Sequence, residues 1–411
     1  MRITKINNLF FDKLQSYIYM ERYVNNGSPS GWHKKHTTSF ETNPFTGKDS
    51  FHLLKFNDEQ NKTKVIGTNK LLECGFNYAH PDSIKSKILN SCGVKLEEST
   101  FDVSPISGAR TMLIRDNNNP GYLKLTYDTS RIGRVDRQLT FNHCLSSYET
   151  CHAIKNAIDS NLTPSGFGIQ LEPAARISYL NYGNDIYEWG VIYREFSPYP
   201  YNNDDVLLVP GFSLFGKDIN NPNDDSLIVQ LIELSGVDPS EYLLTILKMI
   251  VDCYWEIVLS CAFHIECHGQ NCFFELTPNY KIKRFIIKDM DSVDKDIPLA
   301  KKLGLNSKWE SYPFMCFDES IYYYKIRSSY MYDFKLGEYL LSPLISEVAK
   351  NFLLDTNKIE SFIRNYVREK YLVKLPYDYF PLDGRWYNCD NSERQVGQKR
   401  QYYSHENPKY R

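Results

Sequence analysis

A polar loop between two apolar segments holds the residues best suited to chemistry. Four of its side chains are polar: Glu266, His268, Gln270 and Asn271. A second apolar segment then ends abruptly at Asp289. Strand ends and loops at helix ends are where rigid scaffolds place reactive groups. Carboxylate and amide oxygens beside an imidazole suit Mg²⁺ together with nucleotide phosphates. The stretch therefore predicts a magnesium and nucleotide site, with a capped helix and a solvated acidic turn as the alternative.

Hydroxyl and basic residues gather in an earlier segment. Ser107, Arg110 and Thr111 stand together, and small hydroxyls beside an arginine can bind phosphate through charge-assisted hydrogen bonds. Lys124 stands alone on an apolar strand, which is costly unless its ammonium group faces an anion. Three arginines follow that could bind a carboxylate-rich substrate or form a solvated basic turn: Arg131, Arg134 and Arg137. Neither cluster contains a GxxxxGK[ST] or GxGxxG loop, so phosphate binding would depend on side chains.

A zinc hydrolase is the competing interpretation of the loop. His264 and His268 stand four residues apart with Glu266 between them, which superficially resembles HExxH. In that motif the glutamate directly follows the first histidine, so that its carboxylate faces the metal-bound water. Here Glu266 comes one residue later and would lie on a different face of the helix. The spacing disfavours zinc, and we interpret His264 as a histidine of the core or as one that supports a site residue.

The elements that must position these clusters indicate an α+β protein. Its expected form is a mixed central sheet region followed by a mainly helical C-terminal domain. Alternating apolar residues predict two hairpins, one from strands 110–115 and 122–127, and one from 186–193 and 206–209. Short strands are expected at 51–55, 64–67, 272–276 and 284–287. Helical patterns cover 138–160, 226–235, 240–264, 336–354 and 357–370. Apart from its two short strands, the polar first 75 residues are expected to be rich in turns, and the tail beyond 385 to be loose.

Composition excludes several classes of protein. A chain of 411 residues allows two or three domains. Its 48 basic and 50 acidic residues argue against a nucleic-acid binder, which needs a basic excess. The longest apolar stretch, 243–263, carries Lys248, Asp252 and Glu256 along one helical stripe, which a membrane span would not tolerate. The ten cysteines include no CxxC pair, which favours free thiols. We expect a soluble cytoplasmic protein that binds no nucleic acid and no membrane.

Taken together, the clusters resemble the siderophore synthetases that act without a nonribosomal peptide template, the NIS or IucA/IucC-like family. The family's E-x-H-x-Q-N signature is matched in full by the polar loop, and its following R-D motif is similar to Lys288-Asp289. Weaker matches arrive in the family's order. His80-Pro81 is similar to the family's H-P-W-Q motif, and Ser107 to Thr111 is similar to its S-x-R-T motif. Lys124-Leu125 together with Ile132 to Arg137 is similar to K-L-x-L…I-T-x-x-x-R. Arg194-Glu195 is similar to the segment that holds an arginine of the palm.

The resemblance implies a thumb, fingers and palm architecture and a chemistry. Such enzymes use ATP and Mg²⁺ to adenylate a carboxylate, often citrate or another polycarboxylate. An amine or hydroxyl then attacks the adenylate and AMP leaves. Catalytic roles, as cations at the α-phosphate, would fall to His268, Arg110 and Lys124. Nucleotide contacts would come from Ser107, Thr111, Lys124, Gln270 and Asn271. The carboxylate substrate would meet Arg137, Arg134 and His80, and Mg²⁺ would be held by Glu266, Asn271 and Asp289.

The same resemblance divides the chain into four regions. We expect a divergent N-terminal region at 1–95, a fingers-like phosphate-binding region at 96–185, a palm-like catalytic region at 186–300 and a helical FhuF-like region at 301–411. The expected partners are small-molecule carboxylates and amines, and assembly as a homodimer is left open. Two other classes compete: a kinase-like phosphotransferase, in which Gln270 would occupy the place of the catalytic base, and a noncatalytic nucleotide-binding homologue.

Overall fold

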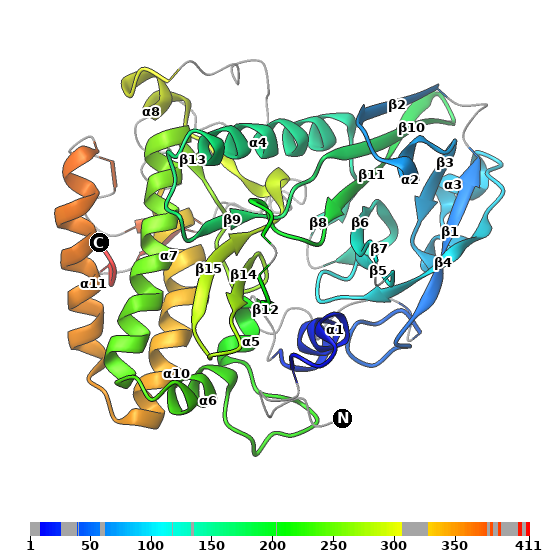
Figure 1. Ribbon diagram of the computed structural model, residues 1–411. Coiled ribbons are helices and arrows are strands. Elements are labelled where there is room, and N and C mark those ends of the chain that lie inside the picture. The colour runs from blue at the N-terminus through cyan, green and yellow to red at the C-terminus, as the bar shows by residue number, and fades with distance from the viewer. Residues whose placement is uncertain are drawn as a thin grey trace.

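The protein combines two β-sheets with a layer of helices, as its α+β sequence pattern predicts (Figure 1). The structure is a computed structural model. It describes residues 9–25, 39, 41–57, 62–116, 118–132, 135–202, 204–305, 328–375, 379–380, 385–387, 402–404 and 408–411.

The first sheet is antiparallel throughout and has the strand order β2-β10-β11-β6-β5-β4-β1-β3. Its strands are β1 (Phe51–Asn57), β2 (Lys62–Gly67), β3 (Phe76–Ala79), β4 (Glu97–Pro105), β5 (Thr111–Ile114), β6 (Gly121–Leu125), β10 (Ala174–Tyr182) and β11 (Asp185–Glu195). The predicted hairpin of β5 and β6 is confirmed, with Thr111 opposite Lys124. Beside this sheet lie α2 (Lys70–Glu73), η3 (Pro81–Lys85), α3 (Lys87–Ser91) and the hairpin of β7 (Tyr127–Ile132) and β8 (Val135–Arg137).

The second sheet has the order β12-β14-β15-β9. It contains β12 (Leu207–Pro210), β14 (Cys272–Leu276), β15 (Ile282–Ile287) and β9 (Phe167–Ile169), of which β9 runs parallel to β15. The predicted hairpin of 186–193 with 206–209 is therefore wrong, because β11 and β12 belong to different sheets. β11 pairs instead with the preceding strand β10, through a tight turn at Gly183, whose φ of +62° suits glycine.

Helices cover the two sheets and connect them. α1 (Lys13–Tyr23) lies against β12, α4 (Phe141–Asp159) spans the top of Figure 1, and α7 (Pro239–Cys261) is the long central helix. Asp238 caps the start of α7 by accepting a hydrogen bond from the backbone of Glu241. The shorter elements are α5 (Gly211–Phe215), α6 (Leu227–Ser235), β13 (Phe263–His264), η4 (Met290–Ser292), β16 (Asp294–Lys295) and α8 (Ile297–Lys302). The turn-rich N-terminus that we expected contains α1, a helix that the sequence analysis missed.

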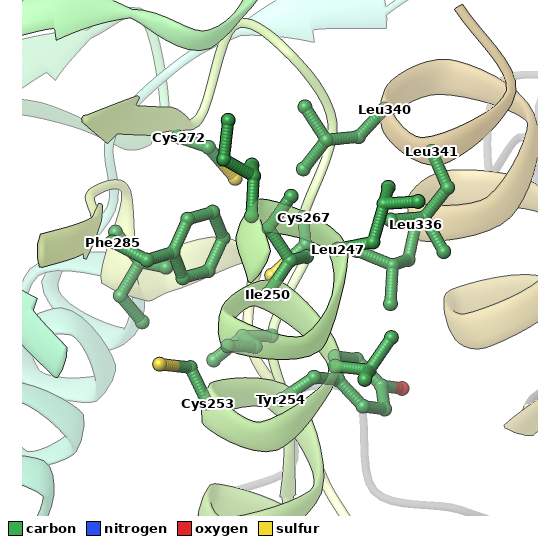
Figure 2. Packing of buried hydrophobic residues seen from close by; sticks show 14 of the residues in the cluster. Leu247, Ile250, Cys253, Tyr254, Cys267, Cys272, Phe285, Leu336, Leu340 and Leu341 are labelled. Carbon is green, nitrogen blue, oxygen red and sulfur yellow. The ribbon is translucent and has the colours of Figure 1, made fainter. Parts of the chain in front are cut away.

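The C-terminal part is mainly helical, as predicted. It contains the π-helix η6 (Tyr330–Leu341), α10 (Ser342–Phe352), α11 (Thr356–Lys370) and η7 (Leu372–Lys374), with a small hairpin of β17 (Arg385–Tyr387) and β18 (Tyr402–Ser404). Apolar side chains of α7, η6 and β15 form one core, which Figure 2 shows around Leu247, Leu336 and Phe285. Within the described ranges, every helix is too short or too polar to cross a bilayer.

Candidate active site

The two clusters singled out in the sequence meet where the two sheets approach each other. Lys124, on β6 of the first sheet, places its Nζ 2.6 Å from Oδ1 of Asp289, which follows β15 of the second sheet. Lys124 also pairs with Asp291. Because Thr111 lies opposite Lys124 in the β5–β6 ladder, the hydroxyl-rich segment shares this position. The fold thus brings together segments that are far apart in the chain.

Asp289 is the carboxylate on which this junction is built. Its backbone is left-handed, with φ +74° and ψ +64°, which turns the chain sharply at the end of β15. Oδ1 accepts a second hydrogen bond from Arg194 Nη2 at 2.6 Å. Burial raises the pKa of Asp289, but the charges of Lys124 and Arg194 outweigh burial and hold that pKa well below its usual range. Asp289 is therefore an anion shared by two cations.

Arg194 is fixed from behind by Glu172. Its guanidinium donates to Glu172 Oε1 through Nε at 2.7 Å and also through Nη2. The other oxygen of Glu172 accepts the hydroxyl of Ser147 and the backbone N–H of Met290 at 3.3 Å. Burial raises the pKa of Glu172, although Arg194 opposes that rise. Sequence reasoning found Arg194 as a weak family match but missed both Glu172 and Ser147, which carry no motif signal.

The segment from Ser107 to Thr111 forms a tight turn beside Gln270. Ala109 has a φ of +55°, and its N–H donates to the carbonyl of Ile106 at 3.0 Å. A Cβ on Gly108 would lie 3.4 Å from Thr111 Oγ1 and 3.8 Å from Gln270 Nε2. The amide of Gln270 therefore reaches across to this turn, and two of the predicted nucleotide contacts, Thr111 and Gln270, are neighbours.

Ser107 is engaged by a carboxylate that the sequence analysis missed. Its hydroxyl donates to Oε2 of Glu21 on α1, and its backbone N–H donates to the same oxygen at 3.3 Å. Lys288 Nζ lies 3.4 Å from Glu21 Oε1, which also accepts the hydroxyl of Tyr17 at 2.8 Å. Glu21 is fully buried, so α1 anchors the predicted phosphate turn. Tyr17 and Glu21, four residues apart on one face of a helix, were the signal that could have revealed it.

Arg110 and Arg137 place two positive charges side by side. Arg110 is buried and donates through Nη1 to the backbone carbonyl of Arg137 at 2.9 Å. Burial, and then the charge of Arg137, lower the pKa of Arg110 to about 10. Arg137 is half-buried, and two neighbouring guanidinium groups favour an anion near them. Arg134, the other predicted carboxylate ligand, lies outside the described residues.

The polar loop is held by Lys335 of η6, another residue that sequence reasoning missed. Lys335 Nζ lies 2.5 Å from Glu266 Oε1, and Asn271 Nδ2 donates to Glu266 Oε2 at 3.3 Å. Burial raises the pKa of Glu266, but the charge of Lys335 outweighs burial and lowers it. No motif surrounds Lys335, so only the fold reveals its position.

His268 is a neutral histidine in this structure. Burial lowers its pKa to about 4, although Glu266 acts in the opposite direction. Its Nδ1 accepts a hydrogen bond from the backbone N–H of Gln270 at 3.3 Å, which places the ring proton on Nε2. Nε2 lies 3.8 Å from Glu266 Oε2. His268 therefore presents a hydrogen-bond donor rather than a cation.

Two further histidines lie away from the junction. His80 is fully buried and caps η3, since its Nδ1 accepts from the backbone of Asp82 at 3.1 Å. Burial lowers its pKa to about 4 against the charge of Asp82. Its ring lies 4.9 Å from that of Tyr127, which pairs with Arg137 across β7 and β8. His264 is enclosed by the core, as predicted, with its Nδ1 2.8 Å from the hydroxyl of Tyr254.

The predicted metal ligands have the right atoms but are already paired. Glu266, Asn271 and Asp289 offer the oxygen donors that Mg²⁺ prefers. Lysines neutralise both carboxylates, since Glu266 faces Lys335 and Asp289 faces Lys124. In the part of the chain that the structure describes, no three His, Cys, Asp or Glu side chains gather closely enough to hold a metal ion. An entering Mg²⁺ would have to share these carboxylates with the lysines.

Comparison with known proteins gives structural neighbours only. No family model and no curated protein matches the sequence. Petrobactin biosynthesis protein AsbB from Bacillus anthracis superposes with a TM-score of 0.68 and 14% identity, over 88% of this chain and 68% of AsbB. Aerobactin synthetase IucC from Klebsiella pneumoniae superposes with a TM-score of 0.69 and 14% identity, over 90% of this chain and 72% of IucC. ATP-bound aerobactin synthetase IucA from the same organism superposes with a TM-score of 0.67 and 12% identity, over 89% of this chain and 70% of IucA.

The chain therefore has the fold of the NIS synthetases, and the fold that the resemblance implied is confirmed. The match covers about nine-tenths of this chain. At 12–14% identity, what this chain shares with these neighbours is the fold.

Proposed function

We propose that this protein is an ATP-dependent ligase that adenylates a polycarboxylic acid such as citrate and joins it to an amine or hydroxyl, as in siderophore biosynthesis. The observation that carries the proposal is the meeting of Lys124 and Arg110 with Asp289 and the polar loop at one junction. The NIS synthetase fold supports it, and one of the structural neighbours is an ATP-bound synthetase.

The residues at the junction fit a nucleotide. Arg110 and Lys124 are buried cations, and Thr111 and Gln270 add a hydroxyl and an amide beside the turn at Gly108. ATP, when bound, supplies the adenylyl group that activates the carboxylate, with pyrophosphate as the leaving group. During that transfer negative charge builds on the α-phosphate. Arg110 and Lys124 are preorganised cations that would stabilise this charge in a buried place.

His268 would act as a hydrogen-bond donor to the same phosphate. Because its pKa is about 4, the ring is neutral at pH 7, and the Gln270 backbone keeps the proton on Nε2. A donor held in one orientation costs no reorganisation when charge develops. This modifies the role that the resemblance implied, in which His268 would contribute a positive charge.

Mg²⁺ would be held by Glu266, Asn271 and Asp289, whose oxygens suit a hard cation. It would supply Lewis-acid charge at the phosphates. In this structure Lys335 and Lys124 balance the two carboxylates, which keeps both of them ionised for a cation.

The carboxylate substrate would lie against Arg137. A guanidinium matches a carboxylate through two parallel hydrogen bonds, and the neighbouring Arg110 adds a second positive charge. His80 contacts Tyr127, which pairs with Arg137 across the β7–β8 hairpin. It would therefore act by supporting the Arg137 hairpin rather than by touching the substrate.

A second candidate is a nucleotide-binding protein without catalysis. It is favoured by one observation: Ser107, predicted to bind phosphate, donates its hydroxyl to Glu21 instead. A kinase-like phosphotransferase is disfavoured because Gln270 is an amide and cannot accept a proton from a substrate hydroxyl.

The nucleotide products distinguish these functions. The protein is incubated with Mg·ATP, an amine and each of citrate, 2-oxoglutarate, succinate and a monocarboxylic acid. The proposed ligase releases AMP and pyrophosphate only when a polycarboxylate is present. ADP as the product would identify a phosphotransferase instead. Mg·ATP that raises the melting temperature without turnover would identify the noncatalytic binder.

A further inference from the structure

Residues 408–411, here called the C-terminal segment, pack against η6. Tyr410 is 2% exposed. Its carbonyl accepts the hydroxyl of Tyr332 at 3.0 Å, and its own hydroxyl lies 2.7 Å from Ser342 Oγ. A Cβ on Gly337 of η6 would lie 3.1 Å from the Tyr410 ring, so the ring packs closely against the helix at this glycine. The segment is therefore built into the helical core.

Arg411 ties the segment to η6 by charge. Its Nε donates to both oxygens of Asp333, at 2.8 and 2.9 Å, and its guanidinium lies over the ring of Phe380 at 4.2 Å. Arg368 on α11 donates to the Arg411 carbonyl at 3.1 Å. The segment thus joins η6 to α11 through hydrogen bonds and an ion pair.

The same π-helix contacts the polar loop at two points. Lys335 Nζ reaches Glu266 Oε1 at 2.5 Å, and the carbonyl of Tyr339 accepts the backbone N–H of Gly269 at 3.3 Å. These contacts lie on both sides of His268 in the sequence. π-Helices are rare, and their usual single-turn form is frequently found at functional sites. η6 therefore contributes to the placement of Glu266 and His268.

We infer that the C-terminal segment is a positioning element of the candidate site, in which Tyr410 and Arg411 fix η6 so that Lys335 and Tyr339 hold the polar loop. Only the kinetic part of the test below rests on the proposed function.

The first test needs no activity. Hydrogen exchange of the ligand-free full chain is compared for wild type, Arg411→Ala, Arg411→Lys and Tyr371→Phe. Tyr371 donates to Asp252 of α7 at 2.6 Å and serves as the matched control, because it is buried in the same helical part. We expect Arg411→Ala to speed exchange of the Gly269 amide by about tenfold, because local opening becomes easier. Arg411→Lys should restore most of the protection.

A uniform rise in exchange across α7, α11 and the loop would overturn the inference, because it would show general destabilisation. So would an unchanged Gly269 amide in Arg411→Ala. If wild type shows no ligation, the proposed function fails, whereas this exchange test still decides the inference.

The second test is a double-mutant cycle on turnover with Lys335→Met. We expect Arg411→Ala alone to lower kcat by about tenfold and to change the KM for ATP by less than about threefold. In the Lys335→Met background, Arg411→Ala should lower kcat by about twofold or less, because contacts in one network are not additive. Equal costs in the two backgrounds would show that Arg411 does not act through Lys335.

Discussion

Lys124 and Asp289 form an ion pair, with Nζ 2.6 Å from Oδ1, that joins the large sheet to the strand end of the small one. Arg194, on the neighbouring strand β11, donates to the same oxygen at 2.6 Å. One carboxylate therefore fixes two cations from adjacent strands before any ligand binds. Such preorganisation is what electrostatic catalysis requires, because the charges need not be moved when the reaction begins.

Asp289→Asn should lower both stability and turnover. Lys124 and Arg194 would lose their shared counter-charge, and we expect a loss of about 2–4 kcal/mol in the free energy of unfolding. Turnover should fall by about 100-fold or more. Urea denaturation and pyrophosphate release measure the two effects. Asp185→Asn, at the exposed first residue of β11, is the matched control, and an equal effect of both substitutions would contradict the account.

The loss of stability in Asp289→Asn should depend on pH with a definite sign. Because the folded-state pKa of Asp289 is lowered, its stabilisation is fully present above about pH 4 and is lost only as pH falls further. The difference in stability between wild type and Asp289→Asn should therefore stay constant from pH 8 to pH 5. A difference that shrinks already at pH 6 would mean that the carboxylate is not held ionised.

Two buried histidines should make the protein sensitive to mild acid. His80 and His268 have pKa values of about 4 in the folded protein, whereas an unfolded histidine titrates near pH 6.5. Below that pH the unfolded state binds more protons, so each histidine lowers the unfolding free energy by up to about 1.4 kcal/mol per pH unit. Urea denaturation should show that, between pH 7 and pH 5, the unfolding free energy of His268→Gln falls by about 2 kcal/mol less than that of wild type. The exposed His152→Gln should behave as wild type.

His268→Ala should affect chemistry more than folding. Loss of one donor to the developing phosphate charge costs roughly 10²–10³-fold in kcat, and the melting temperature should change little at pH 7. Because the ring is neutral, kcat should not fall as pH rises from 6 to 8 on account of this residue. A parallel loss of fold and activity, measured by thermal unfolding and turnover, would assign His268 a structural role.

Glu21→Gln tests whether α1 anchors the phosphate turn. The substitution keeps the shape of the side chain but leaves the buried Lys288 without its counter-charge. We expect a several-degree drop in melting temperature and a rise of about tenfold in the KM for ATP, because Ser107 is no longer held firmly. The exposed Glu233→Gln is the control. If Glu21→Gln tightens ATP binding instead, Glu21 competes with phosphate for Ser107.

Arg137→Lys separates substrate binding from nucleotide binding. Lysine keeps the charge but cannot make the two parallel hydrogen bonds of a guanidinium. The KM for the polycarboxylate should rise by about tenfold or more, while ATP affinity stays within about twofold. Arg115→Lys, which follows β5 and is hydrogen-bonded to Ser104 and Gln15, should change neither. Equal use of monocarboxylates and citrate would refute the polycarboxylate assignment.

Sequence reasoning worked where residue type and local order carry the signal. Lys124, alone on an apolar strand, and Asp289, at an abrupt strand end, each indicated an unusual environment, and the structure pairs them. Glu21 and Lys335 were missed because each reaches the site from a segment distant in the chain. The wrong hairpin at 186–209 had the same cause, since alternation identifies a strand but not its partner. Which sheet a strand joins is decided by packing.

Carboxylate-dependent exchange of radiolabelled pyrophosphate into ATP tests the central claim most directly, because it reports reversible formation of an acyl adenylate without any amine. The account predicts exchange that requires Mg²⁺ and a polycarboxylate, and that Lys124→Ala lowers by about 100-fold or more. ATP hydrolysis to ADP with no exchange for any carboxylate would contradict it.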